Sequence, residues 1–389
     1  MNASTPAPER LASEIGRLEP AMIELTRRAV LINSYSANVA GVDAVGALLA
    51  QAFALPSLQH EAIPGQRYGA HLFWRTRAPG APILLIGHHD TVFPPGHFEG
   101  WSVAGDRATG PGTLDMKGGL AVIWGALAAL EPLGALGRLP LVVASVADEE
   151  VGSPESSPHL LRVARGAAAA LVFESGRQRD MIVTRRRGTG TLGVSFSGRA
   201  AHAGNAHASG RNAVWAMARF IDAAQALTDY ERGSTVNVGL ASGGTSSNTV
   251  PAAAECKVDV RFERSDDATA LLDALRHAAE RAAESVGVGC AISGGANRLP
   301  LDRTPASEAL FREYGAHARA AGLGSDECPL VGGGSDANTV ASAGVPAIDG
   351  LGPRGEGFHT TTEWVDLTSL RPKAEALARF LWQRAAERA

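Results

Sequence analysis

Three short apolar runs, each followed within two residues by an acidic residue or a histidine, constrain the fold of this chain more than any other feature. The runs are Ile83–Ile86, Leu139–Val146 and Ala170–Phe173. Continuous apolar runs of this length are typical of strands that are buried on both faces. Helical patterns separate these strands, so the sequence predicts an α/β fold with a mainly parallel sheet and helices on both faces.

The polar residues that follow these strands form one set of candidate ligands. Because the carboxyl ends of parallel strands lie at one edge of a sheet, we expect these side chains to lie close together. The set joins the strand-end residues to one aspartate from a glycine-rich loop and one late histidine: His88, Asp90, Asp115, Glu149, Glu150, Glu174 and His359. Imidazoles and carboxylates without a thiolate suit hard or borderline divalent metals.

Each member of this set also has an ordinary alternative. A single histidine after a strand is more often hydrogen-bonded than metal-bound, and Asp148–Glu150 could be the acidic first turn of a helix. The recurrence of acids and imidazoles at successive strand ends favours a metal site instead. Two metals that share a carboxylate can lower the pKa of a shared water and polarise a carbonyl, which is the chemistry of amide hydrolysis.

Charge and cysteine content argue against several other classes of protein. The formal net charge of −4 over 389 residues gives no footprint for nucleic acid or an anionic membrane, so a small-molecule partner is expected. The three cysteines have no C-x-x-C spacing, which argues against a thiolate zinc site. The N-terminus lacks a signal-peptide pattern and no apolar run reaches the ~20 residues of a membrane helix, so we expect a cytoplasmic location.

The pattern of expected elements changes near Gly188. Residues 188–298 read as βαββαβ, which is the ferredoxin-like arrangement, and α/β alternation then resumes. The sequence therefore predicts an inserted domain at 188–298, with residues 1–187 and 299–389 forming the domain that carries the candidate ligands.

A series of short motifs runs through the chain in a fixed order. They are G-H-x-D-T-V (Gly87–Val92), G-x-G-x-x-D-M-K-G-G (Gly110–Gly119), D-E-E (Asp148–Glu150), F-E (Phe173–Glu174), A-A-H-A-G (Ala200–Gly204), S-N-x-x-P (Ser247–Pro251), D-V-R (Asp259–Arg261), G-G-G-S-D-A (Gly332–Ala337) and G-x-H (Gly357–His359). With these motifs the chain resembles the M20 family of zinc aminopeptidases, carboxypeptidases and aminoacylases. Within that family it is most similar to glutamate carboxypeptidases of the carboxypeptidase G2 (glucarpidase) type.

The resemblance implies a set of metal ligands. Asp115 would bridge two zinc ions, His88 and Glu174 would complete one of them, and Glu150 and His359 the other. Cobalt or manganese could occupy the same ligands.

Two more residues of the first domain have implied roles. Glu149 matches the general base, which takes a proton from the bridging water and returns it to the departing amine. Asp90 would hydrogen-bond a ligand imidazole and fix its tautomer. His89 lies between His88 and Asp90, but strand alternation turns it to the opposite face, where a packing role is expected.

The inserted domain would complete the site. His202 resembles a histidine that stabilises the tetrahedral oxyanion, in this chain or across a dimer. Asn248 and Arg261 match residues that bind the substrate carboxylate, for which the fork of an arginine is suited. Backbone N–H groups for an anion would come from Gly333, Gly334 and Ser335. The basic turn Arg185–Arg187 could read an acidic substrate side chain or act as a solvated hinge.

The implied function is metal-dependent hydrolysis of an amide bond next to an amino acid with a free carboxylate. The expected substrates are peptides or N-acyl amino acids, and the expected assembly is a homodimer through residues 188–298, which would serve as a lid and dimerisation domain. An aminoacylase or deacetylase of the acetylornithine or succinyl-diaminopimelate type is the alternative. A non-catalytic binding protein on the same fold is more remote, because it predicts loss of ligands and all five are present together with Glu149.

Overall fold

The computed structural model describes residues 8–388, which form two compact units. The first unit comprises the chain through Arg185, Asp302–Leu330 and the residues from Ser335 onward. The second unit comprises Arg186–Leu301 and Val331–Gly334. The segment 1–7, for which the absence of a signal peptide is predicted, lies outside the described residues.

The first unit is built on a six-stranded sheet with the order β1-β2-β6-β3-β7-β14. Its strands are β1 (Gln59–Ile63), β2 (His71–Arg75), β6 (Leu141–Val146), β3 (Ile83–His88), β7 (Ala169–Val172) and β14 (Ala347–Ile348). The last four run parallel, and the first two are antiparallel at one edge. Every residue of β3, β6 and β7 is buried, which explains their continuous apolar sequence.

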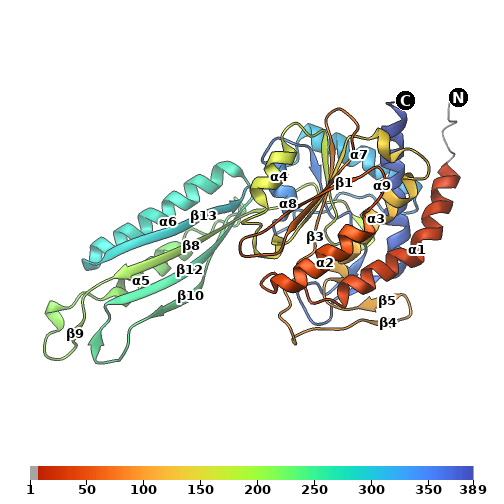
Figure 1. The fold of residues 1–389 in the computed structure, drawn as a ribbon. Helices are drawn as coiled ribbons and strands as arrows, with labels where there is room; N and C mark the ends of the chain where they lie inside the picture. The colour runs from red at the N-terminus through yellow and green to blue at the C-terminus, as the bar shows by residue number, and fades with distance from the viewer. Residues whose placement is uncertain (1–7, 389) are drawn as a thin grey trace. The chain divides into compact units, whose positions relative to one another are not determined.

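Helices cover both faces of this sheet, as the α/β pattern predicts. They are α1 (Pro8–Val30), α2 (Val39–Ala52), α3 (Gly118–Leu130), α4 (Ser157–Ala164), α7 (Pro305–Ala320), α8 (Asp336–Ala341) and α9 (Leu370–Ala386). Helices α1, α3 and α9 pack together on one side, whereas α4 and α8 lie on the other (Figure 1). The window Thr113–Leu130 is long and apolar enough to span a membrane, but 89% of it is buried inside the protein, as in a core helix.

A small antiparallel sheet, which the sequence did not predict, lies beside the main one. Its order is β15 (Gly355–Glu356), β16 (Trp364–Asp366), β5 (Arg107–Thr109) and β4 (Ser102–Ala104). The β16–β5 pair brings the C-terminal segment next to the loop that leads into α3. That loop turns at Gly112, whose φ of 74° and close approach to Thr91 leave no room for a side chain.

The second unit is a four-stranded antiparallel sheet with the order β10-β12-β8-β13. Its elements are β8 (Gly188–Ser197), α5 (Ala213–Gln225), β10 (Thr235–Gly243), β12 (Ala253–Phe262), α6 (Ser265–Val286) and β13 (Gly289–Arg298). A short pair, β9 (Ala201–His202) with β11 (Thr249–Val250), extends past one end of it. The βαββαβ chain order and this strand order confirm the ferredoxin-like arrangement, which has a hydrophobic core of its own.

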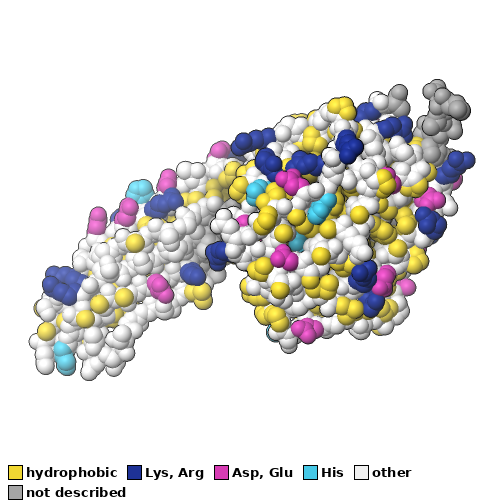
Figure 2. Space-filling model, in the orientation of Figure 1, with side chains coloured by type: hydrophobic (Ala, Val, Ile, Leu, Met, Phe, Trp, Pro, Cys, Tyr) yellow, Lys and Arg dark blue, Asp and Glu magenta, His cyan; other side chains and the backbone are white. Residues whose placement is uncertain are grey.

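Short 3-10 helices connect several of these elements. They are Leu136–Arg138, Glu149–Val151, Gln178–Asp180, His207–Ser209 and Leu367–Ser369, and a single π-helical turn spans Thr113–Lys117. On the face drawn in Figure 2, acidic and basic side chains of the first unit are interspersed and do not form a patch of one sign.

Candidate metal centre

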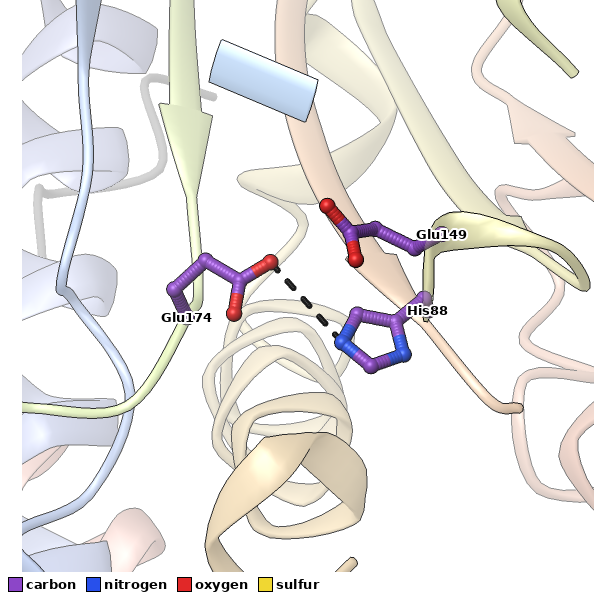
Figure 3. A group of neighbouring side chains, drawn as sticks. All are labelled: His88, Glu149 and Glu174. Atoms are coloured by element: carbon purple, nitrogen blue, oxygen red, sulfur yellow. Dashed lines mark ion pairs between the residues drawn. The ribbon is translucent and has the colours of Figure 1, made fainter. Parts of the chain in front are cut away.

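Three neighbouring strands of the first unit deliver side chains to one place. His88 is the last residue of β3, Glu149 begins the 3-10 turn after β6, and Glu174 follows β7. Their side chains point toward one another in Figure 3, with the His88–Glu174 ion pair dashed. One potential ligand atom from each lies within 4.8 Å of the others. The side chains at the three strand ends therefore lie close together, as expected from the sequence.

Asp115 lies between two imidazoles. Its Oδ1 atom is 3.3 Å from His88 Nε2, and its Oδ2 atom is 3.4 Å from His359 Nε2. Each imidazole has a second carboxylate, because Glu174 Oε1 is 3.8 Å from His88 Nε2 and Glu150 Oε2 is 3.1 Å from His359 Nε2. Two half-sites that share one carboxylate are what a pair of bridged metal ions requires.

Crowding of these groups shifts their pKa values. Hydrogen bonds to Asp115 and Glu150 raise the pKa of His359 to about 10. Burial and the charge of Asp115 raise the pKa of Glu150 to about 8 and that of Glu174 well above its usual value. Burial alone would lower the pKa of His88, but its hydrogen bonds to Asp115 and Asp90 outweigh burial and raise it. The cluster thus holds more acids than it can ionise, and a divalent cation would relieve that repulsion.

Asp90 is buried and links three of the candidate groups. Its Oδ1 atom is 3.3 Å from His88 Nδ1 and accepts a hydrogen bond from the backbone N–H of Glu149 at 3.2 Å. Its Oδ2 atom accepts the N–H of Glu150 at 3.2 Å and the hydroxyl of Ser36 at 2.7 Å. The carboxylate of Asp90 therefore lies beside the His88 ring, where an orienting role is expected. It also holds the backbone of both glutamates, which no sequence motif predicts.

Glu363 is a buried residue of the site that sequence reasoning missed. Its Oε1 atom accepts the N–H groups of Leu114 and Asp115, at 2.8 and 3.0 Å, and its Oε2 atom accepts that of Gly112 at 3.0 Å. Burial raises the pKa of Glu363 to about 7. An acid four residues after His359 was the only signal in the sequence, and it gave no hint of a partner 248 positions away.

His89 is separate from the cluster. Its Nδ1 atom is 2.9 Å from the hydroxyl of Ser145, and its ring approaches Gly46 of α2. Burial lowers the pKa of His89 to about 3, so the ring is neutral. This position agrees with the packing role expected from strand alternation.

Three of the other predicted site residues lie in the Arg186–Leu301 part of the second unit. His202 is exposed in β9, and its Nδ1 atom accepts the N–H groups of Gly204 and Asn205, both at 3.2 Å. Asn248 is beside it, because its carbonyl accepts the N–H of Ala203 at 2.9 Å.

Arg261 lies at the other end of the same sheet. It pairs with Thr189 at the start of β8, whereas Ser197 at the end of β8 pairs with Ala253 near His202. Its guanidinium makes two hydrogen bonds of 2.9 Å to Asp259 on the same strand. One chain therefore does not bring Arg261 together with His202.

The glycine loop and the basic turn have local partners. Ser335 donates its N–H to Asn338 Oδ1 at 3.0 Å in the N-terminal cap of α8, which leaves the N–H groups of Gly333 and Gly334 as candidates for an anion. Two arginines of the basic turn take part in contacts within the second unit. Arg186 is buried and donates to Gly333 O at 3.0 Å, and Arg187 pairs with Glu263 at 2.8 Å.

Several known proteins are similar to this chain in sequence, and several solved structures are similar to it in fold. Residues 184–286 match the peptidase dimerisation domain of the M20 family. Carboxypeptidase G2 of Pseudomonas sp. (strain RS-16) is 29% identical over 377 residues, which cover 93% of this chain and 89% of that relative. A succinyl-diaminopimelate desuccinylase of Acidiphilium cryptum (strain JF-5) is 29% identical over 325 residues, which cover 78% of this chain and 84% of that relative.

Solved structures show the same fold at lower identity. An M20 family metallo-carboxypeptidase of Sulfolobus solfataricus has a TM-score of 0.75 at 17% identity, covering 94% of this chain and 99% of that chain. The chain is thus a homologue of carboxypeptidase G2 that contains the M20 peptidase dimerisation domain, and these relatives make it an enzyme.

Proposed function

We propose that this enzyme is a dinuclear metal hydrolase that cleaves an amide bond next to an amino acid with a free carboxylate, in peptides or N-acyl amino acids. The proposal rests on the position of Asp115, whose two carboxylate oxygens face the imidazoles of His88 and His359. Each of these imidazoles also has a second carboxylate beside it. The donor set is rich in oxygen and imidazole and contains no thiolate, so it fits two zinc ions, and Co²⁺ or Mn²⁺ would suit the same donors.

The ligand division follows the two half-sites. His88 and Glu174 would hold one ion, Glu150 and His359 would hold the other, and Asp115 would serve both. When bound, such ions supply an activated water and a polarised carbonyl. Asp90 fixes the His88 ring and the backbone of the two glutamates, so this part of the site is preorganised.

Glu149 is the proposed general base. Its carboxylate reaches the space shared with His88 and Glu174, and Asp90 holds its backbone N–H. A carboxylate in that place takes the proton of the attacking water and returns it to the departing amine.

His202 is the proposed oxyanion donor. Because its Nδ1 atom accepts two backbone N–H groups, the ring proton lies on Nε2, where it can be donated to an oxyanion. Asn248 is beside His202, whereas Arg261 is at the opposite end of the same sheet, so one small substrate cannot contact all three within one chain. We therefore propose a homodimer through residues 188–298, in which His202 and Asn248 serve the partner's site, while Arg261, Gly333 and Gly334 serve their own.

A deacylase of the acetylornithine or succinyl-diaminopimelate type is the second candidate, favoured by the likeness to a desuccinylase. The two candidates differ in the part of the substrate that they select. The test is hydrolysis of two series, one with a constant acyl group and varied C-terminal residue, the other with a constant amino acid and varied acyl group. Strong dependence on the C-terminal residue supports the carboxypeptidase, and strong dependence on the acyl group supports the deacylase. No hydrolysis in either series would contradict both candidate functions.

The cytoplasmic location stays a prediction.

A further inference from the structure

Arg177 is held close to the candidate ligands by its own loop. It follows Glu174 by three residues, and the backbone between them is fixed on both sides. The N–H of Gly352 donates to Glu174 O at 2.9 Å, and the N–H of Gly176 donates to Pro353 O at 2.8 Å. The segment that contains Gly352 and Pro353 continues to the candidate ligand His359. Arg177 and His359 therefore lie on two stretches of backbone that are hydrogen-bonded to each other.

The guanidinium of Arg177 stacks on an exposed aromatic ring beside that ligand. Its Cζ atom is 5.7 Å from the ring centroid of Phe358. The Phe358 ring in turn meets the His359 ring edge to face, with centroids 5.5 Å apart. Phe358 is 41% exposed, which is unusual for a phenylalanine and means that a substrate can reach this stack from solvent.

The guanidinium makes no hydrogen bond or ion pair with the part of the chain that the structure describes. The Nε atom of Arg177 is buried and makes no hydrogen bond. Arg354 shows the contrast, because its guanidinium binds both Asp180 and Asp366. A buried donor without an acceptor carries a free-energy cost that a bound ligand can remove. The planar fork of arginine matches a carboxylate best.

We propose that Arg177 binds a carboxylate of the substrate other than the one beside the scissile amide. This inference rests on the proposed function, in which Arg261 and the glycine loop are the candidates for that first carboxylate. A second anionic group would be repelled by the acids of the metal cluster, and Arg177 offsets that repulsion. The substrate class is therefore a dicarboxylate. The second charge is either on the amino-acid side chain, as in an N-acyl glutamate, or on the acyl group, as in an N-succinyl amino acid.

The test compares matched charged and neutral substrates on the metal-loaded, full-length enzyme. The pairs are N-benzoyl-glutamate with N-benzoyl-glutamine, and N-succinyl-alanine with N-butanoyl-alanine. In Arg177→Gln we expect kcat/KM for the charged member of one pair to fall by about 10- to 100-fold, mainly through KM, while its neutral partner changes less than about threefold. The pair that responds identifies the source of the carboxylate. Arg179→Gln is the control, because Arg179 is exposed on the same loop, and it should change neither pair.

Two outcomes would overturn the role of Arg177. One is an equal loss for charged and neutral substrates, which would indicate a structural role, and the other is no loss at all. Calorimetric binding of glutamate and of succinate to the wild-type and Arg177→Gln proteins makes the same comparison without turnover. Weaker binding of either ligand to the variant supports the inference, and equal binding contradicts it. If the wild-type enzyme hydrolyses none of the four compounds, the proposed function fails, while calorimetry still decides the role of Arg177.

Discussion

Glu149 and Glu150 are adjacent in the chain, yet their carboxylates have different surroundings. Glu150 contacts His359 at 3.1 Å, whereas Glu149 reaches the space in front of His88 and Glu174. The same Asp90 side chain accepts the backbone N–H of both, so the turn fixes which glutamate points which way. Two identical side chains can therefore have separate tasks, one on the substrate and one on the metal.

This division predicts that two matched substitutions both lower activity but differ in their effect on metal content. Glu149→Gln should lower kcat by about 10²- to 10⁴-fold, the range of general base catalysis, and leave the metal content near that of the wild type. Glu150→Gln should lower the metal content together with activity, because a charged ligand is lost. Metal analysis and steady-state kinetics on both variants make the comparison. Loss of metal in Glu149→Gln, with Glu150→Gln fully loaded, would reverse the assignment.

At the scale of elements, what could be predicted from the sequence depended on length and periodicity. Helices such as α1 and α9 and the buried strand β3 carry long or continuous apolar patterns, so the main sheet and the ligands at its strand ends were predictable. Strands β15 and β16 span only two and three residues, too few for any period to show. The clamp of Glu363 on the loop that carries Asp115 depends on that small sheet, and for this reason it emerged only from the structure.

Glu363→Ala tests that clamp. The change leaves the N–H groups of Gly112, Leu114 and Asp115 without their acceptor, at a cost of about 1–3 kcal/mol for each group that stays buried. We expect a lower melting temperature and weaker metal binding than in the wild type, with Glu363→Gln intermediate because an amide oxygen can still accept. Asp106→Asn, at an exposed acid in the turn between β4 and β5 of the same small sheet, is the control. If Glu363→Ala kept the wild-type melting temperature and metal affinity, the clamp would have no role in the site.

At the scale of the whole molecule, the register of the second unit decides which residues one chain can bring together. The β8–β12 pairing runs from Gly188 with Phe262 to Ser197 with Ala253. At about 3.4 Å per residue this separates the two ends by about 30 Å. His202 and Arg261 flank opposite ends, and no sequence motif could reveal that separation. The motifs place both residues in the inserted domain, but only the strand pairing shows that they are far apart.

This separation predicts that two inactive variants restore each other. Glu149→Gln lacks the base, and His202→Ala lacks the oxyanion donor. A mixed dimer would contain one site with both groups intact if His202 acts on the partner subunit. Random exchange of subunits should then recover about one quarter of the wild-type activity. Each variant dissociated and reassociated alone is the control. Mixed dimers without any recovery would mean that His202 acts within its own chain or not at all.

In the proposed function, hydrolysis depends on two metal ions that share Asp115. The most direct measurement is the rate of hydrolysis of a substrate found in the two series, as a function of metal bound per chain, during zinc addition to chelator-treated enzyme. We expect no turnover without metal, a rate that reaches its plateau at two ions per chain, and failure of Asp115→Ala to reach that plateau. Full turnover in the metal-free enzyme, or an unchanged plateau in Asp115→Ala, would contradict the proposed function.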